Sequence, residues 1–176
     1  TSIASNRMRV VEPEFAFRLG RTLAPRPAQP YSVAEVMNSV DTLHLALELP
    51  DSRFSDFTAV GGPTLIADNA CAHELVVGPA VPAAWRGLDL AQHAVVARIG
   101  EKLTREGLGA NVLGDPRVAL TWLVNELAGL GLALNAGEFV TTGTVTDAWP
   151  VATGETWTSD YGALPVRGLT LTIAGR

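Results

Sequence analysis

The sequence has one cysteine and lacks any long apolar run. With Cys71 alone, no internal disulfide can form, which is consistent with a reducing compartment. No stretch of about 18 apolar residues predicts a transmembrane helix. The first residues, TSIASNRMRV, lack the apolar segment of a signal peptide. We therefore expect a soluble, cytoplasmic protein that does not act at a membrane.

Basic side chains are also scarce. Lys and Arg together number 13 against 18 Asp and Glu, which gives a formal net charge of −5. Nucleic-acid-binding proteins carry a basic face that neutralises phosphates, so this composition argues against a nucleic-acid partner. The single lysine is Lys102. The length of 176 residues and the 47% hydrophobic content suit one globular domain over residues 1–176.

Two segments alternate in the way that β-strands do. In VVEPEFAFRLG, from Val10 to Gly20, Glu12 and Glu14 lie on one face because successive side chains of a strand point to opposite sides. In DTLHLALEL, from Asp41 to Leu49, four leucines form one face, while His44 and Glu48 lie on the other.

The rest of the chain predicts an α+β fold with a β core and helices at its periphery. Ser32 and Glu35 form a capping box that starts a short helix. Asp115 and Pro116 start a longer helix, which Gly131 ends, and Trp122 is expected in the core. The remaining expectations are a loop at 24–30, irregular structure at 51–80, a hairpin at 94–109, and strands at 135–145, 155–162 and 166–175.

Three glutamates brought together would repel strongly. Two like charges about 4 Å apart cost roughly 4 kcal/mol at an effective dielectric constant of about 20. A divalent cation such as Mg²⁺ would remove this cost, because it binds hard carboxylate oxygens. Two glutamates on a solvated strand face are the alternative explanation of the Glu-x-Glu spacing.

A combination of motifs extends this hypothesis. The segments VEPEFAFRLGRTL, LALELPDSRF, LIADNA and ANVLGDPRVALTWLVNELAGLGLALNAGEFVTTGTV occur in this order between about Arg9 and Ile173. Together they resemble the fumarylacetoacetate hydrolase superfamily, and more narrowly its 2-oxopent-4-enoate (2-hydroxypentadienoate) hydratase and 4-oxalocrotonate decarboxylase branch.

The resemblance implies a fold, a metal site and a substrate pocket. The fold would be the mixed β-roll or sandwich of the family's C-terminal domain, in a dimer or a larger homo-oligomer. Glu12, Glu14 and Glu48 would bind Mg²⁺ or Mn²⁺. A small 2-oxo acid substrate would lie near four further residues, and these are Asp68, Asn69, Gly143 and Thr144.

The sequence departs from the branch in one respect. The branch has a further N-terminal segment with a lysine near the metal, and Lys102 lies in no matching motif. We therefore expect either a fragment of a longer chain or an impaired form. Arg18, Arg21 or Arg53 could replace the lysine only by facing inward.

Other candidate residues have ordinary structural alternatives. His44 shares a strand face with Glu48 and is a candidate base, as is Asp68, although a packed or solvated histidine is the alternative. His73 is a second pocket candidate. Cys71 is expected to be a small buried residue, since no catalytic pattern accompanies it. Trp149 follows TGTVTDA and is a candidate for a pocket wall.

The predicted activity is that of a metal-dependent lyase, a hydratase that adds water to a short unsaturated acid such as 2-hydroxypenta-2,4-dienoate in aromatic-compound catabolism. The metal would act as a Lewis acid toward the substrate. Three alternatives stay open at this point: decarboxylation of 4-oxalocrotonate, C–C hydrolysis of an acylpyruvate, and a non-catalytic or scaffolding homologue.

Overall fold

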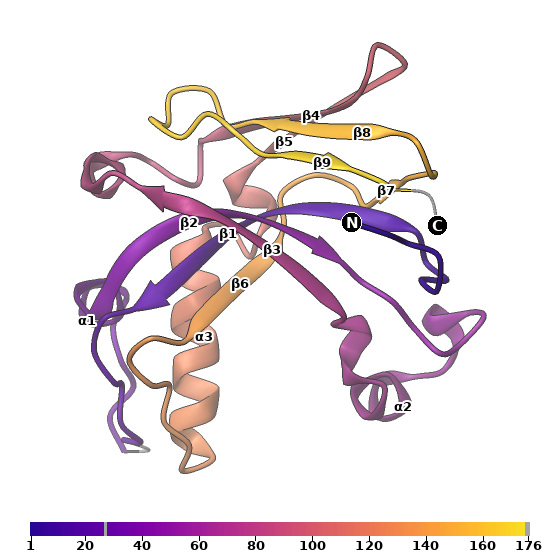
Figure 1. Ribbon diagram of the computed structural model, residues 1–176. Helices are drawn as coiled ribbons and strands as arrows, with labels where there is room; N and C mark the ends of the chain where they lie inside the picture. Colours follow the sequence, from indigo (N-terminus) through magenta and orange to yellow (C-terminus); the bar gives the residue numbers. More distant parts are fainter. Residues whose placement is uncertain (27, 175–176) are drawn as a thin grey trace.

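The computed structural model describes residues 1–26 and 28–174, which form two antiparallel sheets (Figure 1). The first sheet has the order β3-β2-β1-β6, and β7 pairs with the start of β1. Its strands are β1 (Val10–Leu19), β2 (Val40–Leu49), β3 (Glu74–Val81), β6 (Phe139–Thr144) and β7 (Trp149–Pro150). The second sheet has the order β5-β4-β8-β9. Its strands are β4 (Ala94–Ile99), β5 (Leu103–Leu108), β8 (Thr156–Asp160) and β9 (Thr170–Thr172).

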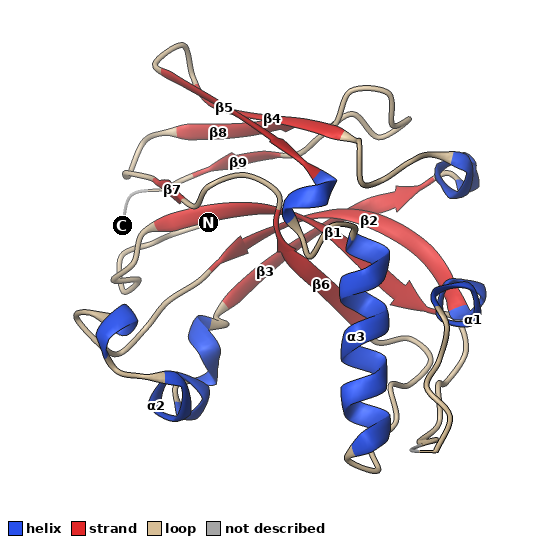
Figure 2. Cartoon of the chain, turned by 180° about the vertical axis from the view of Figure 1, so that it is seen from behind, coloured by secondary structure: helices blue, strands red, loops and turns tan. Residues whose placement is uncertain are grey.

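The helices lie at the periphery, as predicted. Figure 2 shows α3 alongside β6, with α2 at the other side of the molecule. The α-helices are α1 (Val33–Ser39), α2 (Gly62–Ala67) and α3 (Pro116–Gly129). The 3₁₀ turns are η1 (Phe57–Ala59), η2 (Asn69–Cys71), η3 (Ala83–Gly87) and η4 (Gly109–Asn111). No helix within the described ranges has the length and hydrophobicity needed to span a bilayer.

The alternation of the two central strands builds two cores. Phe15 and Leu45 belong to a large cluster that includes the inner face of α3. Val11 and Leu47 belong to a second cluster, which also contains two of the three buried tryptophans, Trp149 and Trp157. The predicted apolar face of β2 is confirmed, because its four leucines are at most 1% exposed. Strands β1 and β2 therefore connect both cores.

Local sequence signals predicted several elements correctly. The Ser32–Glu35 capping box is present and starts α1. Asp115 caps α3 by accepting a hydrogen bond from the Arg117 amide. The hairpin and the later strands are confirmed. Pro27 in the predicted 24–30 loop and Gly175 at the end of the predicted 166–175 strand lie outside the described residues.

Other expectations were wrong. Residues 51–80 are not irregular throughout, because they contain α2 and β3. The strand signal of β3 is weak because it is a sheet edge interrupted by Gly78 and Pro79. Trp122 is 57% exposed. It lies about 200° around α3 from the buried Leu120 and so faces away from the core.

Candidate metal centre

The pairing of β1 with β2 brings three carboxylates together. Glu12 and Glu48 are direct partners across the antiparallel pair, and Glu14 follows two residues later on the same face of β1. Side chains in such positions are near neighbours. One carboxylate oxygen from each of the three glutamates lies within 4.8 Å of the other two. The strand alternation therefore produces the predicted cluster.

Glu14 is the most constrained of the three. It is 1% exposed, and its Oε2 accepts a hydrogen bond of 2.8 Å from the Gly143 amide. That amide is available because β6 carries a β-bulge, where Glu14 pairs with Thr144 and Ala16 pairs with Thr141. The Tyr161 hydroxyl donates to the Glu14 carbonyl oxygen at 3.1 Å. Both the side chain and the backbone of Glu14 are thus held in place.

The cluster is electrostatically uncompensated. Burial raises the pKa of the Glu14 carboxyl to about 8; the Gly143 hydrogen bond opposes the rise, and the charges of Glu48 and Glu12 add to it. Burial and the Glu48 charge also raise the pKa of Glu12. None of the ion pairs among the described residues includes these glutamates. Hard oxygen donors without a cationic partner fit a divalent cation.

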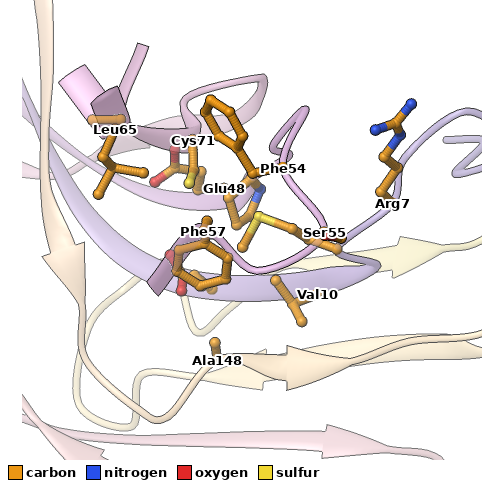
Figure 3. Close-up of a pocket in the computed structure, with 13 residues that line it drawn as sticks. Arg7, Val10, Glu48, Phe54, Ser55, Phe57, Leu65, Cys71 and Ala148 are labelled. Atoms are coloured by element: carbon orange, nitrogen blue, oxygen red, sulfur yellow. The ribbon is translucent and has the colours of Figure 1, made fainter. Parts of the chain in front are cut away.

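A cleft of about 700 Å³ opens beside the cluster (Figure 3). Glu12 and Glu48 are its acidic residues, and Arg7 and Ser55 are further polar residues in its lining. The other walls are mostly apolar and come from four segments: the start of β1 with the residues before it, the loop after β2, α2 with the turn that follows it, and the residue before β7. They include Val10, Phe57 and Leu65. This arrangement can place a small ligand with its polar end at the carboxylates.

The residues predicted to bind substrate differ in where they lie relative to the large cleft. Asp68 is buried outside the large cleft, where it accepts a 2.6 Å hydrogen bond from the Ser52 hydroxyl and pairs with Arg53. These contacts, Ser52 first, lower the pKa of Asp68. Asn69 and Glu48 line a smaller neighbouring pocket of about 180 Å³.

Gly143 and Thr144 lie beside the carboxylates but already have partners. The Gly143 amide holds the Glu14 carboxylate, and the Thr144 hydroxyl donates to the Thr146 carbonyl oxygen at 2.8 Å. In this arrangement the Gly143 amide binds a carboxylate of the chain itself. Its contribution is therefore to position Glu14.

His44 lies away from the cleft. Its Nδ1 is 2.8 Å from the Gly78 carbonyl oxygen, its Nε2 is 2.8 Å from the Thr42 hydroxyl, and its ring packs edge-on against Phe139. His73 lines the small pocket with Asn69 and the adjoining pocket with Asp68. The structure thus places a packed histidine on β2 and a half-exposed one near Glu48.

The basic side chains considered as replacements for a lysine have other partners. Arg18 pairs with Asp41 at 3.0 Å, Arg21 donates to the Asn38 carbonyl oxygen, and Arg53 pairs with Asp68. Lys102 is exposed and lies 3.7 Å from Glu155. None of these four lines the cleft.

Sequence reasoning missed most of the cleft wall. Phe54, Phe57 and Leu65 come from the segment predicted to be irregular, where no periodicity marks an inward face. Trp149, predicted as a wall residue, is 1% exposed within the second core, and its neighbour Ala148 lines the cleft instead. Cys71 is buried as expected, and it too borders the cleft.

The chain has curated relatives among bacterial hydratases and decarboxylases. The chain is 39% identical over 134 residues to a 2-keto-4-pentenoate hydratase of Paraburkholderia xenovorans, a match that covers 76% of the chain and 48% of the hydratase. It is 32% identical over 154 residues to a 4-oxalocrotonate decarboxylase of Pseudomonas, covering 88% of the chain and 56% of that enzyme. The chain belongs to the hydratase and decarboxylase branch of the fumarylacetoacetate hydrolase superfamily. The resemblance predicted from its motifs is confirmed.

Solved structures of this superfamily share the fold. The 4-oxalocrotonate decarboxylase of Pseudomonas putida G7, complexed with magnesium and adipate, superposes with a TM-score of 0.79 at 28% identity. That match covers 93% of the chain and 60% of the decarboxylase. A fumarylacetoacetate hydrolase family protein from Yersinia pestis shares the fold at 20% identity, with a TM-score of 0.68, over 94% of the chain and 70% of its own.

The extent of these matches is partial. The chain spans about half the length of the curated relatives that it matches. No family model matches the chain.

Proposed function

We propose that Glu12, Glu14 and Glu48 bind a divalent cation, Mg²⁺ or Mn²⁺, and that the adjoining cleft binds an unsaturated 2-hydroxy or 2-oxo acid for hydration. One observation carries the proposal. The three carboxylate oxygens lie within 4.8 Å of one another beside a cleft, without a cationic partner among the described residues. Repulsion between them favours a bound cation.

The three glutamates would have different roles in the site. Glu14 is fixed by the Gly143 amide, so its carboxylate would be a preorganised ligand. Glu12 and Glu48 face the cleft and would orient the acid end of the substrate through the shared cation. The apolar walls would shield the bound acid from bulk water. When bound, the cation would supply a Lewis acid that stabilises negative charge developing on the substrate oxygens.

Hydration is the favoured reaction because the relatives with 39% identity are hydratases. Decarboxylation of 4-oxalocrotonate is the second candidate, since a decarboxylase aligns over 154 residues of this chain. The expectations of a single catalytic-type domain, a cytoplasmic location and a homo-oligomer are part of the same proposal.

An assay with three substrates tests the proposal. The chain is incubated with Mg²⁺ and, separately, with 2-hydroxypenta-2,4-dienoate, 4-oxalocrotonate and an acylpyruvate, and each loss of absorbance is followed. We expect turnover of the dienoate that chelation abolishes and added Mg²⁺ restores. Turnover of the acylpyruvate alone would reject hydration. Metal binding without any turnover would favour the non-catalytic alternative.

A further inference from the structure

The cleft is polar at one end and apolar over most of its remaining wall. Glu12 and Glu48 mark the polar end. Figure 3 shows Phe54 and Phe57 on either side of Glu48, with Leu65 and Val10 toward opposite sides of the view. These side chains are only half-buried in the absence of a ligand. An apolar ligand would therefore remove further hydrocarbon surface from water.

The cleft is also larger than the acid end of a substrate requires. Its volume of about 700 Å³ lies within the range of about 300–1,000 Å³ that holds drug-sized ligands. The names of the matched hydratases refer to pentenoate and hexadienoate, which are small acids. Such an acid bound at Glu12 and Glu48 would leave much of the apolar wall in contact with water.

Among the described residues that line the cleft, none directs a cationic group toward Phe54, Phe57 and Leu65. Arg7 has the only cationic side chain among the described residues that line the cleft, and its Nη1 donates to the Arg53 carbonyl oxygen at 2.6 Å. In Figure 3 its guanidinium group extends away from Val10 and Phe57. A second carboxylate placed at this end would lose its water without gaining a counter-ion.

We propose that the cleft selects acids whose far end is an apolar alkyl or aryl group, and that it disfavours dicarboxylic acids of the same length. This inference rests on the proposed function, because that function places the acid end of the ligand at the glutamate cluster. The selectivity arises from the walls formed by Phe54, Phe57 and Leu65, toward which no described residue of the cleft directs a cation.

A binding series tests the proposal without requiring turnover. Saturated 2-oxo acids of increasing length, from 2-oxobutanoate to 2-oxooctanoate, are titrated into the Mg²⁺-loaded chain and followed by calorimetry. Full burial of a methylene group corresponds to about fourfold tighter binding, so we expect a gain of about two- to fourfold for each added methylene. Affinity that is flat or falls with length would overturn the proposal, and so would a lack of binding at every length.

A matched pair of ligands tests the charge preference. 2-Oxohexanoate and 2-oxoadipate have the same carbon chain and differ in a terminal methyl or carboxylate group. We expect the methyl-terminated acid to bind at least about tenfold more tightly, because the apolar wall offers the carboxylate no counter-ion. Equal or tighter binding of 2-oxoadipate would overturn the proposal.

Two neighbouring residues on α2 supply a matched pair of variants. Leu65 lines the cleft, whereas Ile66 is 74% exposed and does not. We expect Leu65→Ser to reduce the gain in affinity per methylene, and Ile66→Ser to leave that gain unchanged. Phe57→Ser, on a separate segment, gives an independent test if Leu65→Ser does not fold. An unchanged length dependence in a folded variant of either wall residue would count against the assignment.

The two proposals fail in different ways. If the affinity increases with chain length but no dienoate is hydrated, the proposed activity is wrong and the selectivity is retained. If 2-hydroxypenta-2,4-dienoate is hydrated but longer or arylated acids bind no better, the activity is retained and the selectivity is wrong.

Discussion

At the scale of single residues, the three glutamates share one site but differ in their exposure. Glu12 and Glu48 line the cleft, whereas Glu14 does not line it and is almost completely buried. Burying a carboxylate without a cation is unfavourable, and like charges nearby add to the cost. The cluster therefore lowers the stability of the metal-free fold, and a bound cation would reverse that effect.

The variant Glu48→Gln should separate the role of Glu48 in binding the cation from its effect on the stability of the metal-free fold. We expect Mn²⁺ affinity to fall at least about tenfold, which is about 1.4 kcal/mol. The metal-free variant should melt at a higher temperature than the wild type, because the charge of Glu48, which repels the neighbouring carboxylates, is removed; each 1 kcal/mol is worth about 2–4 °C in a chain of this size. Calorimetry and thermal melting in EDTA measure the two quantities.

Glu101→Gln is the control for this variant, since Glu101 is an exposed residue in the turn between β4 and β5. It removes the same charge far from the cluster and should change neither quantity. Wild-type Mn²⁺ affinity in Glu48→Gln would contradict the assignment of Glu48 as a ligand.

Metal binding should depend on pH through Glu14. Its pKa of about 8 means that the metal-free site holds a proton near neutral pH, which a cation must displace. We expect apparent Mn²⁺ affinity to rise about tenfold per pH unit up to about pH 8 and then to level off, as measured by titration between about pH 6 and about pH 9. In Glu14→Gln the remaining affinity should lose this slope. A steep slope retained in that variant would assign the proton to another group.

The same raised pKa affects stability in the metal-free protein. The folded state holds the Glu14 proton more tightly than the unfolded chain, whose carboxyl has its ordinary pKa of 4.5. The Glu14 contribution to stability is therefore fully present below about pH 4.5 and is lost as the pH rises toward about 8. Urea midpoints in EDTA should fall across this interval, and saturating Mg²⁺ should remove the fall.

At the scale of elements, the β-bulge in β6 determines how Glu14 is held. Thr142 and Gly143 together oppose Phe15, which turns the Gly143 amide toward the Glu14 carboxylate. Gly143 has a φ of +113°, a conformation that side chains with a Cβ adopt only with strain. The glycine therefore permits the bulge, and the bulge supplies the hydrogen bond.

Gly143→Ala should weaken both the fold and the metal site. An added Cβ would lie 3.5 Å from Val112, an ordinary van der Waals contact. The loss of folding stability therefore comes from the strained backbone conformation and should be about 1–3 kcal/mol. Any relaxation of φ moves the amide away from Glu14, so Mn²⁺ affinity should also fall. Urea denaturation and calorimetric titration measure these effects.

Gly137→Ala is the matched control for the bulge. Gly137 also has a positive φ, of +89°, but it lies in the turn before β6, away from the carboxylates. It should lower stability by a similar amount without changing Mn²⁺ affinity. If both variants weaken metal binding equally, the effect belongs to general destabilisation and not to the bulge.

The elements also show which features the sequence predicts. The alternation in β1 and β2, the Ser32–Glu35 capping box and the Asp115 cap are encoded within a few neighbouring residues and were predicted correctly. The bulge was not predictable in this way, because it depends on which strand pairs with β1. The cleft wall likewise depends on where the 51–71 segment folds back, and that segment has no periodic pattern. The alternation predicted which faces carry Glu12, Glu14 and Glu48, whereas their convergence requires β1 to pair with β2 and was implied by the family resemblance.

At the scale of the whole molecule, the two central strands connect two cores. Phe15 and Leu45 pack in one cluster, and Val11 and Leu47 pack in the other. The three glutamates lie on these same strands, so a cation bound there would hold β1 against β2. Both clusters depend on the pairing of these two strands. Separation of the strands would expose both cores together, which favours a single cooperative unfolding transition.

A cation should therefore raise the melting temperature of both cores equally. At about 100 times the dissociation constant, the expected stabilisation is about 2.7 kcal/mol, or roughly 5–10 °C at about 2–4 °C for each kcal/mol. In a variant with Trp85→Phe and Trp122→Phe, fluorescence reports Trp149 and Trp157 of the second core, and far-UV circular dichroism follows α3 on the first. Both signals should shift together with Mn²⁺ and return with EDTA. A shift in only one of them would mean that the cation stabilises one core alone and that the shared strands do not couple the two.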